Sequence, residues 1–184
     1  MKDEINKLLE PLLGTTIKTS YATGGGCINQ TQVLELNNGA RVFMKQNSNP
    51  PTDFFLAEVK GLRLLSKAKN GPRIPKPIAL QSGPRPTFLI MEYLESSNES
   101  KNFSDRLAQK LAELHRISQG HFGLDHDNFI GSTPQKNDLE KDGIVFFRDH
   151  RIQFQKQLAQ KAGLLPVSID KKIDSLCENL NRFL

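Results

Sequence analysis

Apolar residues alternate every second position in short segments of the first half of the chain, such as Ala40–Gln46, and recur every third or fourth position in other segments, which dominate the second half. The first pattern is typical of strands and the second of amphipathic helices. Before residue 95 it predicts one main helix, over 52–65, and an amphipathic stretch over 1–13. It also predicts five strands, over Thr16–Tyr21, Ile28–Leu36, Ala40–Gln46, Ile78–Leu80 and Thr87–Met91.

Polar residues from Glu92 to Ser100 interrupt both patterns and predict a hinge followed by a loop. Beyond it the spacing predicts only helices, over 104–117, 143–162 and 168–183. We therefore expect an α+β chain with a β-rich N-lobe at 1–95 and a partial helical C-lobe at 96–184. A small sheet joined by a hinge to helices is the two-lobe arrangement of protein kinases.

Glu58 lies in the apolar stripe of the 52–65 helix, on the face that Phe54, Leu62 and Leu65 share. A buried carboxylate needs a cation, and Lys45 closes the preceding strand. A strand lysine held by a helix glutamate and aimed at nucleotide phosphates is a feature of protein-kinase-like folds. We predict a Lys45–Glu58 salt bridge; the alternative is a solvated lysine beside a ragged helix edge.

A glycine run, Gly24-Gly25-Gly26 followed by Cys27, joins two predicted strands. Walker A and dinucleotide-binding loops open a helix instead, so the context favours a kinase-type phosphate flap. Inward-pointing N–H groups would favour the Cys27 thiolate and permit an oxidant-dependent homodimer. The alternative, which the sequence supports equally, is that Cys27 is a small buried residue that packs under the loop.

Composition narrows the function classes. With 37% hydrophobic residues and no apolar run near the roughly 20 residues of a membrane span, we expect no membrane contact. The charged N-terminus predicts no signal peptide, and Cys27 and Cys177 form no disulfide framework, so we expect a cytoplasmic protein. The net charge of +5 is spread over both halves, so we expect no nucleic-acid partner.

Arg151 interrupts the apolar stripe of the 143–162 helix, so we expect it to be buried and bound to a carboxylate or backbone carbonyls. His115 shares a face with leucines and is interpreted as a core histidine rather than a catalytic one. Residues 125–128 (Asp-His-Asp-Asn) could bind a metal, but their spacing favours a turn. Residues 148–151 (Arg-Asp-His-Arg) contain the residue types of a kinase catalytic loop, but in a different order and within a predicted helix. We therefore do not interpret them as a catalytic loop.

Several segments together resemble the fructosamine kinase (ketosamine-3-kinase) family. They are the glycine loop, Phe43-Met44-Lys45, the Glu58 helix, Phe88 to Leu94, Leu111 to His115, Asp127 to Asn137 and Phe146 to Ile152. The resemblance implies ATP- and Mg²⁺-dependent phosphorylation of the sugar 3-hydroxyl of ketosamines, a deglycation activity. It also implies that the hinge contacts ATP through Met91, Glu92, Tyr93 and Leu94.

Two departures from the family pattern limit that expectation. Leu139 and Gly143 stand where the family usually has tryptophans. The family's His-Gly-Asp catalytic loop and metal-binding Asp would fall beyond Leu184, so we expect no catalytic base or metal ligand in this sequence and no activity of the chain alone. Apolar side chains are then expected to face other structure: Phe147, Phe154, Leu158, Leu176, Leu180 and Phe183.

Two other functions stay open. One is a related small-molecule kinase of the aminoglycoside or choline type, which shares the lysine and the glutamate. The other is a non-catalytic nucleotide-binding or interaction module.

Overall fold

The computed structural model describes residues 2–24, 28–83 and 87–184, which form two compact units, 1–117 and 118–184. The first unit is a five-stranded antiparallel sheet in the order β1-β2-β3-β5-β4. Its strands confirm the predicted set: β1 Ile17–Ala22, β2 Gln30–Leu36, β3 Arg41–Asn47, β4 Pro77–Gln81 and β5 Thr87–Glu92.

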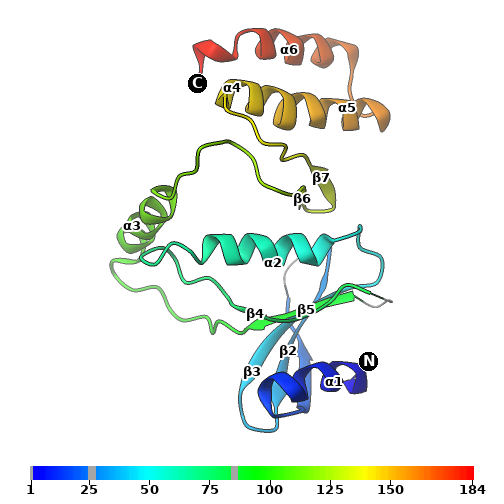
Figure 1. Cartoon of the computed structure of the whole chain (residues 1–184), viewed down its shortest axis with the longest axis vertical. Helices are drawn as coiled ribbons and strands as arrows, with labels where there is room; N and C mark the ends of the chain where they lie inside the picture. The colour runs from blue at the N-terminus through cyan, green and yellow to red at the C-terminus, as the bar shows by residue number, and fades with distance from the viewer. Residues whose placement is uncertain (1, 25–27, 84–86) are drawn as a thin grey trace. The chain divides into compact units, whose positions relative to one another are not determined.

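One helix covers each face of this sheet (Figure 1). Helix α1 (Lys2–Leu13) buries Ile5 and Leu9 against even-numbered strand residues such as Met44. Helix α2 (Phe54–Leu65) buries Phe55 and Val59 against Leu89 and Met91 on the other face. Because side chains alternate along a strand, the odd-numbered residues of β3, including Lys45, face the side of α2.

The predicted phase of α2 is wrong by part of a turn. Its buried residues are Phe55, Ala57 and Val59, and Leu65 is 40% exposed. Glu58 therefore lies on the flank of the apolar face rather than in its middle.

Helix α3 (Phe103–His115) follows the polar loop and buries none of its residues. His115 is exposed, so its interpretation as a core histidine is wrong: the leucines that share its face are themselves about 40% exposed. Lys110 donates to the carbonyl of Gly71 at 3.1 Å, which fixes α3 to the connection between α2 and β4. The predicted lobe boundary at residue 95 stays a prediction.

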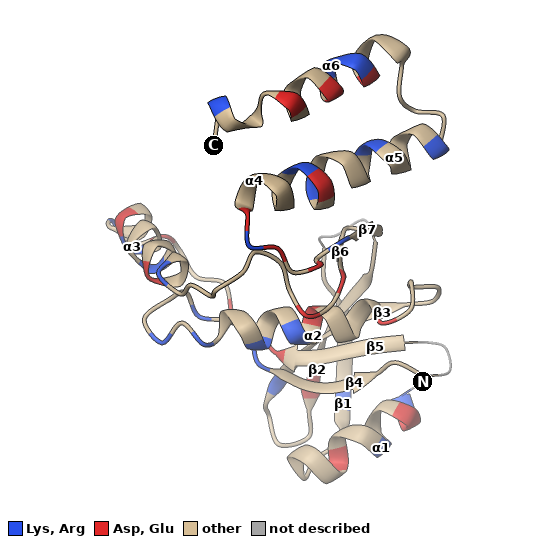
Figure 2. Ribbon diagram, turned by 45° about the horizontal axis from the view of Figure 1, so that its top comes forward, with Lys and Arg blue, Asp and Glu red and all other residues tan. Residues whose placement is uncertain are grey.

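The second unit begins with a hairpin that the sequence pattern did not predict. Strands β6 (Asn128–Ile130) and β7 (Thr133–Gln135) are only three residues long, too short to show alternation. One continuous helical segment follows: α4 (Gly143–Phe146), the π-helix η1 (Phe147–Gln153) and α5 (Phe154–Lys161). Helix α6 (Val167–Glu178) and the 3₁₀ turn η2 (Leu180–Arg182) end the chain. Figure 2 shows acidic and basic positions along α6, whereas the charged positions of α5 are all basic.

The apolar residues expected to face other structure differ in their exposure. Phe147, Leu176 and Phe183 are exposed. Phe154 and Leu158 are half-buried, and Leu180 is only 3% exposed because η2 turns it into the unit. Cys177 is a buried free thiol. In the described part of the chain, no helix is long and apolar enough to cross a membrane.

Candidate functional site

The predicted salt bridge is present. The Nζ atom of Lys45 lies 2.5 Å from Oε1 of Glu58, and the two side chains are 28% and 25% exposed. Strand β3 and helix α2 hold the two residues on the same side of the sheet. Because the pair is partly open to solvent, the lysine can be reached by a ligand while the glutamate restricts its rotamers.

Three rows of side chains cross the α2 face of the sheet, since paired residues of neighbouring strands lie side by side. Lys45 is flanked by Thr31 and Leu89. Phe43, two residues away, is flanked by Val33 and Met91, which are buried. Arg41 is flanked by Glu35 of β2 and by Tyr93, which follows β5. The Cζ atom of Arg41 lies 5.0 Å from the centroid of the Tyr93 ring. The face therefore runs from polar to apolar to polar.

The predicted phosphate loop begins beside Lys45. The N-terminal end of the loop is held to β2 by Thr23 and Thr31. The Thr23 N–H donates to the Thr31 carbonyl, and the Thr23 hydroxyl donates to the Thr31 hydroxyl, both at 3.0 Å. The C-terminal end of the loop is held to β3 by Asn47, whose side chain donates to Oδ1 of Asn29 at 2.9 Å and to the Ile28 carbonyl at 3.3 Å. Both ends of the loop are therefore fixed to β2 and β3, next to Lys45.

The loop itself is described only in part. Gly24 is exposed and nothing lies within 4 Å of the position that a Cβ atom would take. Gly25, Gly26 and Cys27 lie outside the described residues, so their predicted roles, including the reactive thiol and the homodimer, stay predictions. The loop anchors Thr23, Thr31 and Asn47 were missed, because a single threonine or asparagine at a strand end carries no distinctive spacing.

The hinge residues divide between two faces. The Met91 side chain is buried on the α2 face. The Glu92 carboxylate accepts hydrogen bonds from Arg73 and, at 3.4 Å, from the backbone N–H of Lys76. The Arg73 bond is the larger cause that holds the pKa of Glu92 below its usual value. The Tyr93 ring lies under Arg41, and Leu94 is half-buried.

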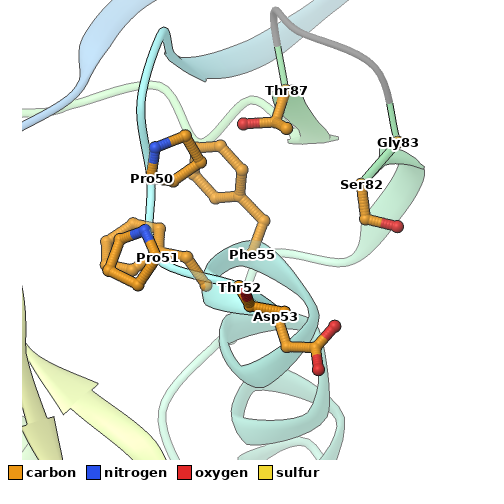
Figure 3. Close-up of a pocket in the computed structure, with 9 residues that line it drawn as sticks. Pro50, Pro51, Thr52, Asp53, Phe55, Ser82, Gly83 and Thr87 are labelled. Atoms are coloured by element: carbon orange, nitrogen blue, oxygen red, sulfur yellow. The ribbon is translucent and has the colours of Figure 1, made fainter.

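A separate pocket of about 180 Å³ lies at the start of α2 (Figure 3). Its described lining comes from Pro50 to Phe55 and from Ser82, Gly83 and Thr87, and Asp53 is the charged residue among them. Neither Lys45 nor Glu58 lines it. This pocket is therefore separate from the predicted phosphate site.

In the second unit, Arg151 fixes the β6–β7 hairpin to the π-helix. It donates to the carbonyls of Lys136 and, at 3.1 Å, His150, and to Oδ1 of Asn137 at 2.7 Å. The predicted carbonyl partners are confirmed, but the side chain is half-buried rather than mostly buried. Burial lowers the pKa of Arg151. Asn137 is 1% exposed and also donates to Asn128 and to the His126 carbonyl.

The acidic residues before the hairpin contact neighbouring basic side chains. Asp125 lies 2.5 Å from Nδ1 of His126, and Asp127 lies 2.6 Å from Nζ of Lys136. No group of three or more acidic, histidine or cysteine residues in the described ranges could hold a metal ion. The described residues therefore do not fit a Mg²⁺ site, and we derive no step through the metal from them.

Phe122 fills the space beside Gly143, one of the two positions where the family usually has tryptophan. A Cβ atom at Gly143 would lie 2.7 Å from the Phe122 ring. The ring also packs against Phe146, with centroids 6.2 Å apart. Leu139, the other such position, is 54% exposed.

Comparison with known proteins agrees with this geometry. The family model described as "Fructosamine kinase" matches residues 1–184. The chain is 35% identical over 171 residues to a "Protein-ribulosamine 3-kinase, chloroplastic" of Oryza sativa subsp. indica, covering 91% of this chain and 48% of the relative. It is 34% identical over 152 residues to a "Probable ketoamine kinase" of Synechocystis, covering 82% and 51%. The chain thus spans about half the length of these relatives.

Crystal structures support the same fold. A "Putative fructosamine-3-kinase" of Haemophilus somnus superposes with a TM-score of 0.84 at 27% identity, covering 97% of this chain and 61% of that one. A protein with the same description from Thermobifida fusca gives a TM-score of 0.85 at 20% identity, covering 98% and 62%, and supports the fold alone. The five-stranded sheet with its helices is therefore the kinase-like fold predicted from the sequence, and the chain belongs to the fructosamine kinase family.

Proposed function

We propose that this chain is the ATP-binding part of a ketosamine kinase, which transfers a phosphoryl group to a sugar hydroxyl of an amine adduct. The observation that carries the proposal is the Lys45–Glu58 salt bridge beside the anchored ends of the glycine loop. A lysine held by a helix glutamate presents one positive charge to the phosphates.

The rows on the sheet match the parts of a nucleotide. Lys45 and the loop supply donors and positive charge for the triphosphate. Phe43, Val33 and Met91 supply an apolar surface for the base. The hinge from Glu92 to Leu94 supplies backbone groups that would read the edge of the adenine ring.

The proposal also concerns the catalytic base and the metal ligands. We assign the base and the Mg²⁺ ligands to the part of the family fold that this sequence does not cover, since the relatives match over about half their length. The 184-residue chain would then bind ATP without transferring phosphate. A reducing compartment such as the cytoplasm suits a protein whose buried Cys177 is a free thiol.

Calorimetric titration of the chain with ATP tests nucleotide binding. Lys45→Met should weaken binding at least tenfold, because the phosphates lose a direct positive charge. Lys18→Met is the matched control, since it removes another Lys–Glu ion pair of the same sheet, 2.8 Å long. Equal affinity of the wild type and Lys45→Met would contradict the proposal.

A fusion protein tests the substrate. Residues 1–184 are joined to the complementary part of the Escherichia coli relative, to which the chain is 31% identical over 182 residues. We expect ATP-dependent phosphorylation of a lysine ketosamine, lost in the Lys45→Met fusion. Phosphorylation of choline or an aminoglycoside instead would assign the chain to a different small-molecule kinase.

A further inference from the structure

The hinge is held by arginines on both faces of the sheet. Glu92 pairs with Val42 across β5 and β3, and its side chain points away from the α2 face, toward Arg73 and the connection before β4. The backbone N–H of Glu92 also donates to the Lys76 carbonyl at 2.8 Å. This side of the hinge is therefore fixed by one carboxylate with two donors.

Arg41 holds the next residues of the hinge from the α2 face. Its Nη2 atom lies 2.8 Å from Oε1 of Glu95, while its guanidinium covers the Tyr93 ring at 5.0 Å. One planar cation thus contacts two hinge residues, which a lysine could not do with the same geometry. Arg41 lies four residues from Lys45 along β3, about 13 Å, so it is too far to share the same phosphate group.

We propose that Arg41 is a positioning residue for base recognition: by stacking on Tyr93 and pairing with Glu95, it fixes the hinge backbone that would read the adenine edge. This inference rests on the proposed ATP site. It separates two functions along one strand, with Lys45 serving the phosphates and Arg41 serving the base through the hinge.

The separation predicts different ligand dependence for the two residues. Inosine triphosphate has the phosphates of ATP but a different base edge, and tripolyphosphate has no base. Arg41→Gln should weaken ATP binding roughly three- to tenfold, the range of a cation–π contact with an exposed ion pair. It should reduce the preference for ATP over inosine triphosphate and leave tripolyphosphate affinity within about twofold.

Two variants control for charge and shape. Lys18→Gln removes the same charge from the same sheet and should leave base preference unchanged. Arg41→Lys keeps the charge but loses the planar contact, so its base preference should lie between those of Arg41→Gln and the wild type.

Tyrosine fluorescence gives a readout that needs no nucleotide. The sequence has two tyrosines and no tryptophan, so Tyr93 is the sole aromatic emitter of consequence in a Tyr21→Phe background. We expect Arg41→Gln in that background to make Tyr93 emission more accessible to acrylamide, with Lys18→Gln leaving it unchanged.

The outcomes separate the two proposals. If the wild type binds neither ATP nor tripolyphosphate, the proposed nucleotide site is wrong and the role of Arg41 in base recognition falls with it. If the wild type binds both, but Arg41→Gln weakens them equally or leaves base preference intact, only the inference about Arg41 is overturned.

Discussion

The guanidinium of Arg151 lies over the ring of Phe146, five positions earlier in the chain, with Cζ 4.4 Å from the ring centroid. Residues five apart approach each other in the wide turns of a π-helix, which runs here from Phe147 to Gln153. The same guanidinium reaches Asn137 and the Lys136 carbonyl. The π-helix therefore orients one arginine to hold both an aromatic ring and the β6–β7 hairpin.

Replacing Arg151 with lysine should destabilise the second unit by about 1–3 kcal/mol, because the buried Asn137 oxygen loses its donor and the ring loses its planar partner. Hydrogen exchange of amides in residues 137–151 measures the change. Arg148→Lys is the control, since the Arg148 guanidinium donates to both carboxylate oxygens of its neighbour Asp149, at 2.7 and 2.9 Å. Equal loss of protection in both variants would contradict a specific role of the Arg151 contacts in stabilising the second unit.

Two glycines should respond to alanine in opposite directions. Gly123 has φ +103°, and a Cβ there would lie 2.6 Å from the Asn137 carbonyl oxygen, so Gly123→Ala should destabilise by more than about 1 kcal/mol. Gly61 lies within α2 with nothing within 4 Å of its Cβ position. Gly61→Ala should stabilise by about 0.5–1 kcal/mol. Urea unfolding measures both, and a destabilised Gly61→Ala would be the contrary result.

Acid should remove the contribution of Glu92 to stability. The hydrogen bond from Arg73 lowers the pKa of this carboxyl in the folded chain, with burial opposing and the Lys76 N–H assisting. A lowered pKa stabilises the fold above the ordinary carboxyl pKa, and the contribution disappears as pH falls through the folded value. The melting temperatures of wild type and Glu92→Gln should therefore differ most near pH 7 and converge as the pH falls through the lowered pKa of Glu92.

Glu99 provides the control for this pH dependence, because it is exposed in the polar loop after the hinge. Glu99→Gln should change the melting temperature little at any pH. A Glu92→Gln difference that does not shrink at all as the pH is lowered to acid unfolding would mean that the ion pair with Arg73 adds no stability.

Lys156 joins α5 to α6. Its buried ammonium contacts Asp174 and, at 3.0 Å, Asp170, which lie four residues apart on α6. The hydrogen bond to Asp174 is the larger cause that raises the pKa of Lys156. Lys156→Met leaves two facing carboxylates without a cation and should lower the melting temperature by roughly 3–8 °C. Lys161→Met, exposed on the same helix, should change it by less than about 1 °C.

Much of the first unit follows from local pattern. Period-two alternation, short apolar runs and the turn residues between them located all five strands, and the Lys45–Glu58 pair followed from the cost of an unpartnered carboxylate. The phase of α2 did not, because Phe54, Phe55 and Val59 support two overlapping apolar stripes. Only contact with Leu89 and Met91 selects between them.

The second unit depends on contacts that no short-range pattern carries. The β6–β7 hairpin is held by Asn137 and Arg151, polar residues fourteen positions apart. The π-helix shifts the stripe so that Phe146 faces His150 and Arg151, while Phe147 is 43% exposed. The exposure of Phe147 agrees with the expectation that this side chain faces other structure.

The most direct test of the nucleotide site is a double-mutant cycle on ATP affinity with Lys45→Met, Glu58→Gln and the double variant. If Glu58 acts by aiming Lys45 at the phosphates, each single substitution lowers the affinity for ATP, and the double variant binds ATP no more weakly than Lys45→Met does. The coupling energy between the two residues is then about 1–3 kcal/mol. Adenosine affinity should stay unchanged in all three. Additive losses, or an equal loss for adenosine, would contradict a phosphate site built on this salt bridge.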